Sequence, residues 1–334
     1  MLRRGGTTPS EAMQLTEEVF LRLAERGCKE RIVSVEHVRH LQEEIEGNYK
    51  QGLLDKEFYQ ERLAYFDFRI PDNLREVKSL IVIAVPRPQS QAMFTWNGKS
   101  RALIIPPTYV ANEKTRKQME HLLTRILATK GYRVARTALP LKLLAVRSGL
   151  GSYGRNNICY VPDMGSFLQL VAFYSDLPCH EDNWQEAQIM RSCQNCYACR
   201  QNCPTGAISS DRFLLHAERC ISFHNEKKGD VPFPSWMECS WHNCLIGCLH
   251  CQRVCPQNGE FLQWIEEKEE FSQEETALLL EGVPRDQLPA TTMRKLKHLD
   301  LLEDTDILPR NLGVFFRKQK RNCPELHYSG RGRI

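Results

Sequence analysis

Cysteines in the middle of the chain follow the spacing of iron–sulfur ligands. The first motif is Cys193-x₂-Cys196-x₂-Cys199-x₃-Cys203-Pro204. The second, farther along the chain, is Cys248-x₂-Cys251-x₃-Cys255-Pro256. In paired motifs of this kind, three thiolates of one run bind one cubane cluster, and the cysteine that precedes proline binds the other cluster. The spacing therefore predicts two 4Fe–4S clusters and electron-transfer chemistry.

The second motif is one cysteine short, because Leu245 stands three residues before Cys248. In the crossed arrangement, the first cluster is complete with Cys193, Cys196, Cys199 and Cys255. The second cluster has Cys203, Cys248 and Cys251 and needs one more ligand. The candidates for this ligand are Cys220, Cys239 and Cys244, and spacing alone does not choose among them.

Other uses of these cysteines are less consistent with the sequence. Structural zinc usually takes two separated cysteine pairs rather than three thiolates in one run followed by Cys-Pro. A disulfide framework is not expected, because residues 1–27 are charged and lack the apolar segment of a signal peptide. Covalent haem needs a C-x-x-C-H motif, which the sequence does not contain.

Composition indicates a cytoplasmic protein that is larger than a simple ferredoxin. The chain has 334 residues, of which 42% are hydrophobic, enough for about two domains with a sizeable core. No apolar run approaches the roughly 20 residues of a membrane helix, so no membrane association is expected. The net charge of +4 is too small to predict a nucleic-acid partner. The basic segment from Arg317 to Ile334 either contacts phosphates or is simply solvated.

Apolar patterning divides the chain into four segments. Helical periodicity extends over about residues 10–60, and an amphipathic helix is predicted at 113–130 with Gly131 as its cap. Apolar runs predict buried strands at 79–86 and 167–174, with a further strand or edge segment at 101–107. We therefore predict a helical segment (1–65), an α/β domain (66–190), a double-cluster domain (191–260) and a helical tail (261–334).

The segment Gly149-Leu-Gly-Ser-Tyr-Gly154 matches the G-x-G-x-x-G pattern of dinucleotide-binding loops. Such a loop follows a strand and opens a helix. Here residues 141–147 are predicted to be a helix and a strand follows the glycines, so we expect no dinucleotide site. The glycines either allow a sharp turn or close approach to a flat ligand, or they simply end the helix.

Several segments together resemble the epoxyqueuosine reductases, which are similar in turn to corrinoid-dependent reductive dehalogenases. The segments are Arg147–Asn156, Gly165–Pro178, Cys203-Pro-Thr-Gly-Ala207, Arg219-Cys220-Ile-Ser-Phe223 and Gly247–Asn258. The resemblance covers roughly residues 69–258, with a weaker match at 310–312. It implies an α+β fold, in which a nitroreductase-like α/β corrinoid-binding domain is followed by a ferredoxin-like double-cluster module and a short helical tail.

The resemblance also implies roles for individual residues. Cys220 would be the remaining ligand of the second cluster, completing the set Cys203, Cys220, Cys248 and Cys251. The loop after the predicted helix would bind the corrinoid cofactor, cobalamin, through Gly149, Gly151, Gly154, Arg155 and Asn156.

Two departures from the family pattern concern the reaction itself. The family has a catalytic aspartate just before the helix that leads to the glycine loop, but the corresponding residues 135–140 contain no carboxylate. Since a reductive dehydration needs a positioned acid, the sequence does not predict epoxyqueuosine as the substrate. Arg136 and Tyr153 are candidate replacements. The family's Gly-Trp-Ile-Gly-Lys is Gly151-Ser-Tyr-Gly-Arg155 here, which changes the geometry of the cation.

The sequence thus predicts an iron–sulfur reductase. Its two clusters would relay electrons from an external donor of the ferredoxin or flavodoxin type to a bound corrinoid. The substrate is unidentified, and a modified nucleoside in tRNA is one candidate. The alternative is a non-catalytic electron carrier that holds two clusters and no corrinoid. The missing aspartate favours the carrier, whereas the α/β domain and the retained glycine loop favour the enzyme.

Overall fold

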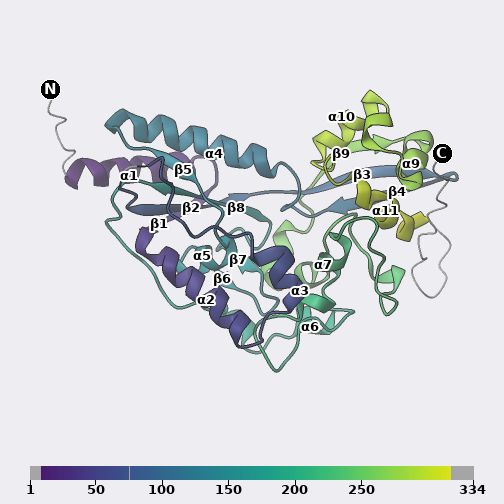
Figure 1. Cartoon of the computed structure of the whole chain (residues 1–334), viewed down its shortest axis with the longest axis horizontal. Coiled ribbons are helices and arrows are strands. Elements are labelled where there is room, and N and C mark those ends of the chain that lie inside the picture. Colours follow the sequence, from purple (N-terminus) through teal and green to yellow (C-terminus); the bar gives the residue numbers. More distant parts are fainter. Residues whose placement is uncertain (1–8, 75, 317–334) are drawn as a thin grey trace.

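The structure is a computed structural model that describes residues 9–74 and 76–316 (Figure 1). The basic segment from Arg317 to Ile334 lies outside the described residues. None of the described helices is both long enough and apolar enough to cross a bilayer.

A four-stranded antiparallel sheet forms the centre of the first half of the chain (Figure 1). Its strands lie in the order β1 (Lys29–Ser34), β2 (Ser79–Pro86), β8 (Leu168–Ser175) and β5 (Val134–Arg136). The strands predicted at 79–86 and 167–174 are confirmed as β2 and β8. Both are buried on two faces, which explains why their sequences are almost continuously apolar.

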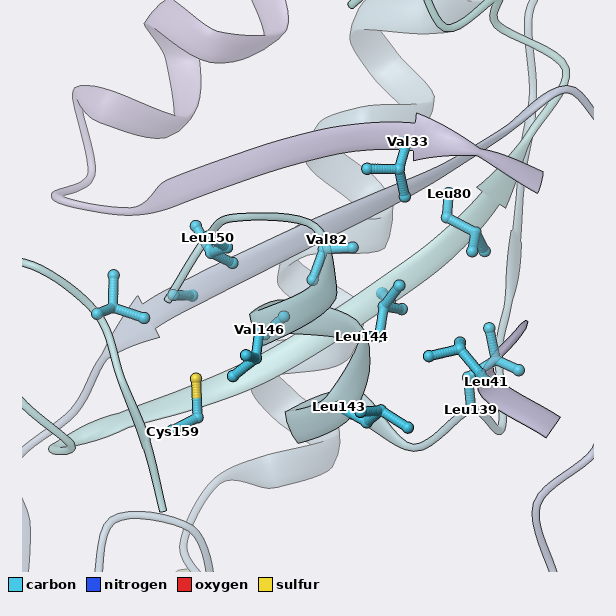
Figure 2. Packing of buried hydrophobic residues seen from close by; sticks show 14 of the residues in the cluster. Val33, Leu41, Leu80, Val82, Leu139, Leu143, Leu144, Val146, Leu150 and Cys159 are labelled. Atoms are coloured by element: carbon cyan, nitrogen blue, oxygen red, sulfur yellow. The ribbon is translucent and has the colours of Figure 1, made fainter. Parts of the chain in front are cut away.

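Helices cover both faces of this sheet. One layer contains α1 (Pro9–Ala24) and α4 (Asn112–Leu127), and the other contains α2 (Val38–Lys50) and α5 (Leu141–Arg147). Side chains of β2 alternate between the two layers, so that Ile81 packs with the first and Val82 with the second. Figure 2 shows the second layer, where side chains from β1 and β2 face those of α5.

The prediction of helices throughout residues 10–60 is wrong at β1, which pairs with β2 at the edge of the sheet. Ile32 and Val33 are buried on its two faces. The three preceding residues are charged and only partly buried, as is common on edge strands. This charged start hides the alternation that would otherwise have identified a strand.

A second, three-stranded sheet joins distant parts of the chain. It has the order β4 (Lys99–Ile105), β3 (Gln89–Trp96) and β9 (Ile265–Phe271), with β9 parallel to β3. The possible edge segment predicted at 101–107 is confirmed as part of β4. The tail predicted to be helical from residue 261 also contains a strand, β9, whose sequence Ile-Glu-Glu-Lys-Glu-Glu-Phe lacks apolar alternation. Its buried Phe271 stacks on Phe94, with ring centroids 4.6 Å apart.

Three helices complete the core around this second sheet: α9 (Gln273–Glu281), α10 (Ala290–His298) and α11 (Leu308–Phe316). The region that carries the cysteine motifs has only short helices, namely α6 (Ala198–Gln201), α7 (Ile221–Asn225) and α8 (His250–Arg253). The remaining short elements are α3 (Lys56–Phe58) and the hairpin of β6 (Ser152–Tyr153) and β7 (Cys159–Tyr160). The cysteine region therefore depends on contacts with its neighbours for its shape.

Arg310 on α11 supplies several of these contacts. Its side chain is 5% exposed, and its guanidinium donates hydrogen bonds of 2.6–3.0 Å to four backbone carbonyls, those of Asn225, Lys227, Lys228 and Val231. The side chain of Asn225 in turn bonds both the N–H and the C=O of Gly247, at 2.9 and 2.6 Å. Arg310 thus holds the backbone next to Cys248. Burial lowers the pKa of Arg310 to about 10, so the group is still charged at neutral pH.

We expect Arg310→Met to lower the free energy of unfolding by about 3 kcal/mol, because it leaves several buried carbonyls without a donor. The measurement is urea denaturation at pH 7. Arg285→Met is the matched control: Arg285 is half-exposed and pairs with Glu303, so its loss should change stability by less than about 0.5 kcal/mol. Equal effects of the two substitutions would contradict the structural role of Arg310.

Candidate iron–sulfur centres and the adjoining cavity

The structure gathers the eight predicted cluster ligands into two groups, and all eight are free thiols. Cys199 has Cys193, Cys196 and Cys255 as its electrostatic neighbours, and these four are the set predicted for the first cluster. Cys251 has Cys203 and Cys220 as neighbours, and Cys248 adjoins Cys220 and Cys251. These four are the set predicted for the second cluster. Cys251 is also within electrostatic range of Cys199, so the two sets adjoin.

The alternatives for the vacant ligand position differ in their surroundings. Cys220 directly precedes α7 and has Cys203 as an electrostatic neighbour. Cys244 is 1% exposed and packs with Ile104 and Leu249 in a small apolar cluster, although it also adjoins Cys248. The structure thus places Cys220 within the second set and gives Cys244 an apolar packing role.

Burial raises the pKa of the thiols of Cys220, Cys248 and Cys251. Such thiols stay protonated at neutral pH unless a metal displaces the proton. Among the described residues, no three Cys, His, Asp or Glu side chains converge on a position for a single metal ion. A four-iron cluster binds its thiolates at different irons, so its ligands need no common point. The donor set therefore fits two 4Fe–4S clusters.

Arg155 holds the loop of the first set. Its Nε donates to the carbonyl of Cys196 at 3.0 Å, and its Nη2 donates to the carbonyl of Cys193 at 2.5 Å. The guanidinium also lies over the ring of Tyr197, 4.9 Å from the centroid. The contacts of Arg155 are thus with the cluster loop, although the resemblance implied a contact with the corrinoid. The planar guanidinium of Arg155 can donate to two carbonyls at once. The ammonium of a lysine does not have this fixed geometry.

Asn156 and Tyr160 reach the cysteines from the same hairpin. Asn156 Nδ2 donates to Tyr160 Oη at 3.0 Å and lies 3.5 Å from the carbonyl of Cys251. Burial, followed by the proximity of the Cys255 thiol, raises the pKa of Tyr160. The sequence analysis selected Asn156 but missed Tyr160, because a lone tyrosine gives no spacing signal.

The glycines of the G-x-G-x-x-G segment have packing roles. Gly149 follows α5 with φ +74°, and the bonds Leu150 N–H to Ala145 O and Gly149 N–H to Val146 O form a Schellman cap. A Cβ on Gly151 would lie 2.6 Å from Tyr160 O, and one on Gly154 would lie 2.6 Å from the Tyr160 ring. Gly149 therefore ends the helix α5, which was one of the roles predicted for these glycines. Gly151 and Gly154 make room for Tyr160. Corrinoid binding by the three glycines stays a prediction.

A cavity of about 1070 Å³ lies within electrostatic range of the second cysteine set, through Lys142 in its wall. Its walls are formed by the segment 137–143, by β8, and by residues of α2 and α3. Residues 212–214, from the loop between Cys203 and Cys220, close one side. The lining is mostly apolar and aromatic, and includes Phe58, Tyr65, Phe66, Leu139 and Phe213.

The two candidate proton donors differ in position. Tyr153 lines the cavity, is 7% exposed, and has a pKa raised by burial, which makes it a weak acid. Arg136 is not part of the lining. Its guanidinium is bound to Glu120 at 2.7 and 2.8 Å and to Glu113 at 2.9 Å, so it serves as a surface ion pair.

The sequence analysis missed Lys142, in the first turn of α5. Lys142 lines the cavity, and its only described polar contact is with the carbonyl of Asn157 at 3.5 Å. Although water reaches this side chain from the cavity, the surrounding protein lowers the pKa of its ammonium. Cys220 and Cys251 of the second set are among its electrostatic neighbours. Lys142 lies two residues after Pro140, close to the position of the family's catalytic aspartate. This position was the sequence signal that could have identified Lys142.

We expect Cys220→Ala to remove one cluster and leave the other. Anaerobic reconstitution followed by iron and sulfide analysis should find about eight irons per chain in the wild type and about four in the variant. Cys244→Ala is the matched control and should retain about eight, because its thiol packs against apolar side chains. Loss of iron from the Cys244 variant alone would assign the ligand to Cys244.

Comparison with known proteins supports the cluster assignment. Residues 192–258 match the family model of the 4Fe-4S double cluster binding domain. The epoxyqueuosine reductase of Staphylococcus aureus is 33% identical over 117 residues, which are 35% of this chain and 29% of that protein. The enzyme of Leadbetterella byssophila is 33% identical over 156 residues, 45% of this chain and 48% of that protein. The chain thus matches less than half of the length of either relative.

Solved structures extend the similarity to most of the chain. The epoxyqueuosine reductase of Bacillus subtilis has a TM-score of 0.63 and 22% identity, over 91% of this chain and 81% of that one. An epoxyqueuosine reductase solved with an epoxyqueuosine-modified tRNA stem loop gives the same values. At this identity the likeness establishes the fold, and it confirms the expected α+β architecture. In its cysteine region and its overall fold, the chain is therefore similar to the epoxyqueuosine reductases, and its residues 192–258 are a double 4Fe–4S cluster domain.

Proposed function

We propose that this protein is an iron–sulfur reductase whose two clusters carry electrons from an external ferredoxin- or flavodoxin-type donor to the cavity. One observation carries the proposal: Lys142 belongs to the cavity wall and is also an electrostatic neighbour of Cys220 and Cys251. The second set of thiols is therefore within electrostatic range of the cavity wall. The first set lies beside the exposed ring of Tyr197, where an external donor can approach.

The proposed cofactor of the cavity is a corrinoid. The volume of about 1070 Å³ is at the upper end of ordinary small-molecule sites, as a large flat cofactor requires. A corrinoid bound there would supply low-valent cobalt, which cleaves or reduces substrate bonds. The aromatic residues Phe58, Tyr65 and Phe66, together with the segment 137–143, would hold it. The cavity favours the enzyme over the non-catalytic carrier, because a carrier needs no such space.

The proposed substrate class is a modified nucleoside in tRNA. The support is the likeness in fold to an epoxyqueuosine reductase solved with a modified tRNA stem loop. The cavity also presents cations that could meet a polyanion: Lys142 has no carboxylate partner among the described residues, and Arg212 donates only to the carbonyls of Leu53 and Leu215.

Lys142 is our candidate for the proton donor that replaces the missing aspartate. Its Nζ lies on the side of the cavity next to the second cysteine set, where electrons arrive. A lowered pKa brings an ammonium closer to the range in which it gives up a proton readily. Glu44 is another cavity group with a shifted pKa. Burial raises the pKa of Glu44, but this carboxyl lies 3.8 Å from Arg147 and adjoins Glu186.

Titration of the anaerobically reconstituted protein with cobalamin should show uptake of about one equivalent per chain, because the cavity has room for a single flat cofactor of this size. Absorbance and EPR of the cobalt measure the uptake. Cobalt reduction by dithionite should be faster when both clusters are present, so the Cys220→Ala variant should bind cobalamin and reduce it more slowly. No uptake at high cobalamin concentration would instead support the carrier.

We expect Lys142→Met to lower turnover at least about 100-fold, since this is the usual contribution of a general acid. The assay uses an epoxyqueuosine-containing tRNA stem loop, and iron content and cobalamin uptake should stay unchanged. Wild-type turnover should fall as pH rises through the lowered pKa of Lys142, because the acid must be protonated.

Two further variants separate the possible roles of Lys142. Lys142→Arg keeps the charge but cannot give up a proton, so recovery of activity in it would assign an electrostatic role instead. Loss of turnover in Glu44→Gln together with full turnover in Lys142→Met would assign the proton to Glu44. Failure of the wild type to bind the stem loop at low salt would remove tRNA as the substrate.

A further inference from the structure

The two cysteine sets differ in their distance from the protein surface. Between the cysteines of the first motif, Gln194, Asn195 and Tyr197 are exposed, and the ring of Tyr197 is 45% exposed. In contrast, none of the residues 244–252, which carry two ligands of the second set, is exposed. The second set is also the one within electrostatic range of Lys142. The first set is therefore the outer one, and an external electron donor would reach it first.

Charge is distributed unevenly along the cysteine motifs. Residues 187–210 and 239–259 contain every predicted cluster ligand except Cys220, and they include no aspartate or glutamate. The lysines and arginines of these two segments are Arg191, Arg200 and Arg253, and all three are exposed. This imbalance is local, because the whole chain has 45 Lys and Arg against 41 Asp and Glu.

The exposed arginines lie around the outer set. Arg200 belongs to α6 and Arg253 to α8, and these two helices contact each other. Arg191 is in the helical turn that ends at Cys193, and Tyr197 directly precedes α6. We call Tyr197 and these three residues the arginine surface. Figure 1 shows α6 at the lower edge of the molecule, on the opposite side from α4.

The arginine surface has no carboxylate partner within the described part of the chain. Arginines elsewhere do have such partners; Arg69 pairs with Asp67, and Arg133 with Asp176. Arg155 is different again, because it is half-buried and bonds the carbonyls of the cluster loop. An arginine that is exposed and does neither can bind an anionic group of another molecule.

We propose that the arginine surface docks an acidic electron-carrier protein, which passes single electrons to the first cluster. One electron leaves the carrier and enters the cluster, and no proton or atom moves. The composition fits such an interface, since tyrosine and arginine are enriched at protein contacts. Opposite charges speed the encounter of two proteins, and redox partners typically share only a small interface. The proposal rests on the proposed function, in which the clusters accept electrons from outside.

The test is the anaerobic mixing of the reconstituted full chain with a reduced flavodoxin of low isoelectric point. Stopped-flow absorbance follows reduction of the clusters, and calorimetry with the oxidised flavodoxin measures binding. In Arg200→Glu, and separately in Arg253→Glu, the second-order rate constant at low salt should fall about tenfold and binding should weaken, because the reversed charge repels an acidic partner. In 1 M NaCl, where the Debye length is about 3 Å, the variants and the wild type should react alike.

Arg125→Glu is the matched control. Arg125 is exposed on α4 and also has no carboxylate partner among the described residues, so this variant changes the net charge equally but should keep the wild-type rate constant. Cluster potentials measured by EPR, and an iron content of about eight per chain, should be the same in all the variants. If one variant loses iron, Arg191→Glu tests the same surface in its place.

The outcomes separate this proposal from its alternatives. Unchanged rate constants in Arg200→Glu and Arg253→Glu overturn it, and so does an equal fall in Arg125→Glu. A shift in cluster potential that accounts for the fall would show that the arginines act on the cluster instead. Weaker binding of a tRNA stem loop, with flavodoxin binding unchanged, would assign the surface to nucleic acid.

A wild type that neither binds flavodoxin nor takes electrons from it also overturns the docking proposal. The proposed reductase does not fall with it, because cobalamin uptake and cobalt reduction by dithionite are measured without a protein donor. Conversely, docking on the arginine surface together with no cobalamin uptake would support the non-catalytic carrier.

Discussion

The structure depends on one constraint, which is the placement of eight buried or partly buried thiols in a region that has almost no regular structure of its own. The helices there are only four or five residues long, too short to be stable alone. The position of each thiol must therefore be imposed from outside. Polar side chains from the surrounding elements do this by bonding the backbone of the cysteine loops, with Arg155 on one side and Arg310 on the other.

These contacts explain why the α/β sheet, the second sheet and the cysteine region form one unit. The hairpin of β6 and β7 follows α5 of the second layer and ends against the first cysteine set. Asn258, just after Cys255, donates to the hydroxyl of Ser166 and accepts from its N–H, both at 2.8 Å, at the start of β8. The cavity lies where these parts meet, so its walls come from segments far apart in the chain.

The features predictable from the sequence were those with a periodic or spacing signal. Two buried strands, the amphipathic α4 and the grouping of the cysteines have such signals in their apolar runs and in Cys-x-x-Cys spacing. β1 and β9 have none, because they are charged strands whose neighbours bury only a few of their side chains. Lys142 and Tyr160 belong to the site only through tertiary proximity, which no local pattern encodes. The surroundings of Arg136 were hidden for the same reason, since its partners Glu113 and Glu120 come from α4.

The link between α11 and the cysteine region has a consequence for biosynthesis. The residue before Cys248 is held through Asn225, and Asn225 is held by Arg310 and Asn311, which are among the last described residues of the chain. During translation, the second set of thiols is therefore exposed on the ribosome before the helix that fixes its geometry has emerged. The geometry of this set is therefore complete only once α11 has been made and has packed, whereas Arg155, which holds the loop of Cys193 and Cys196, is made before those cysteines.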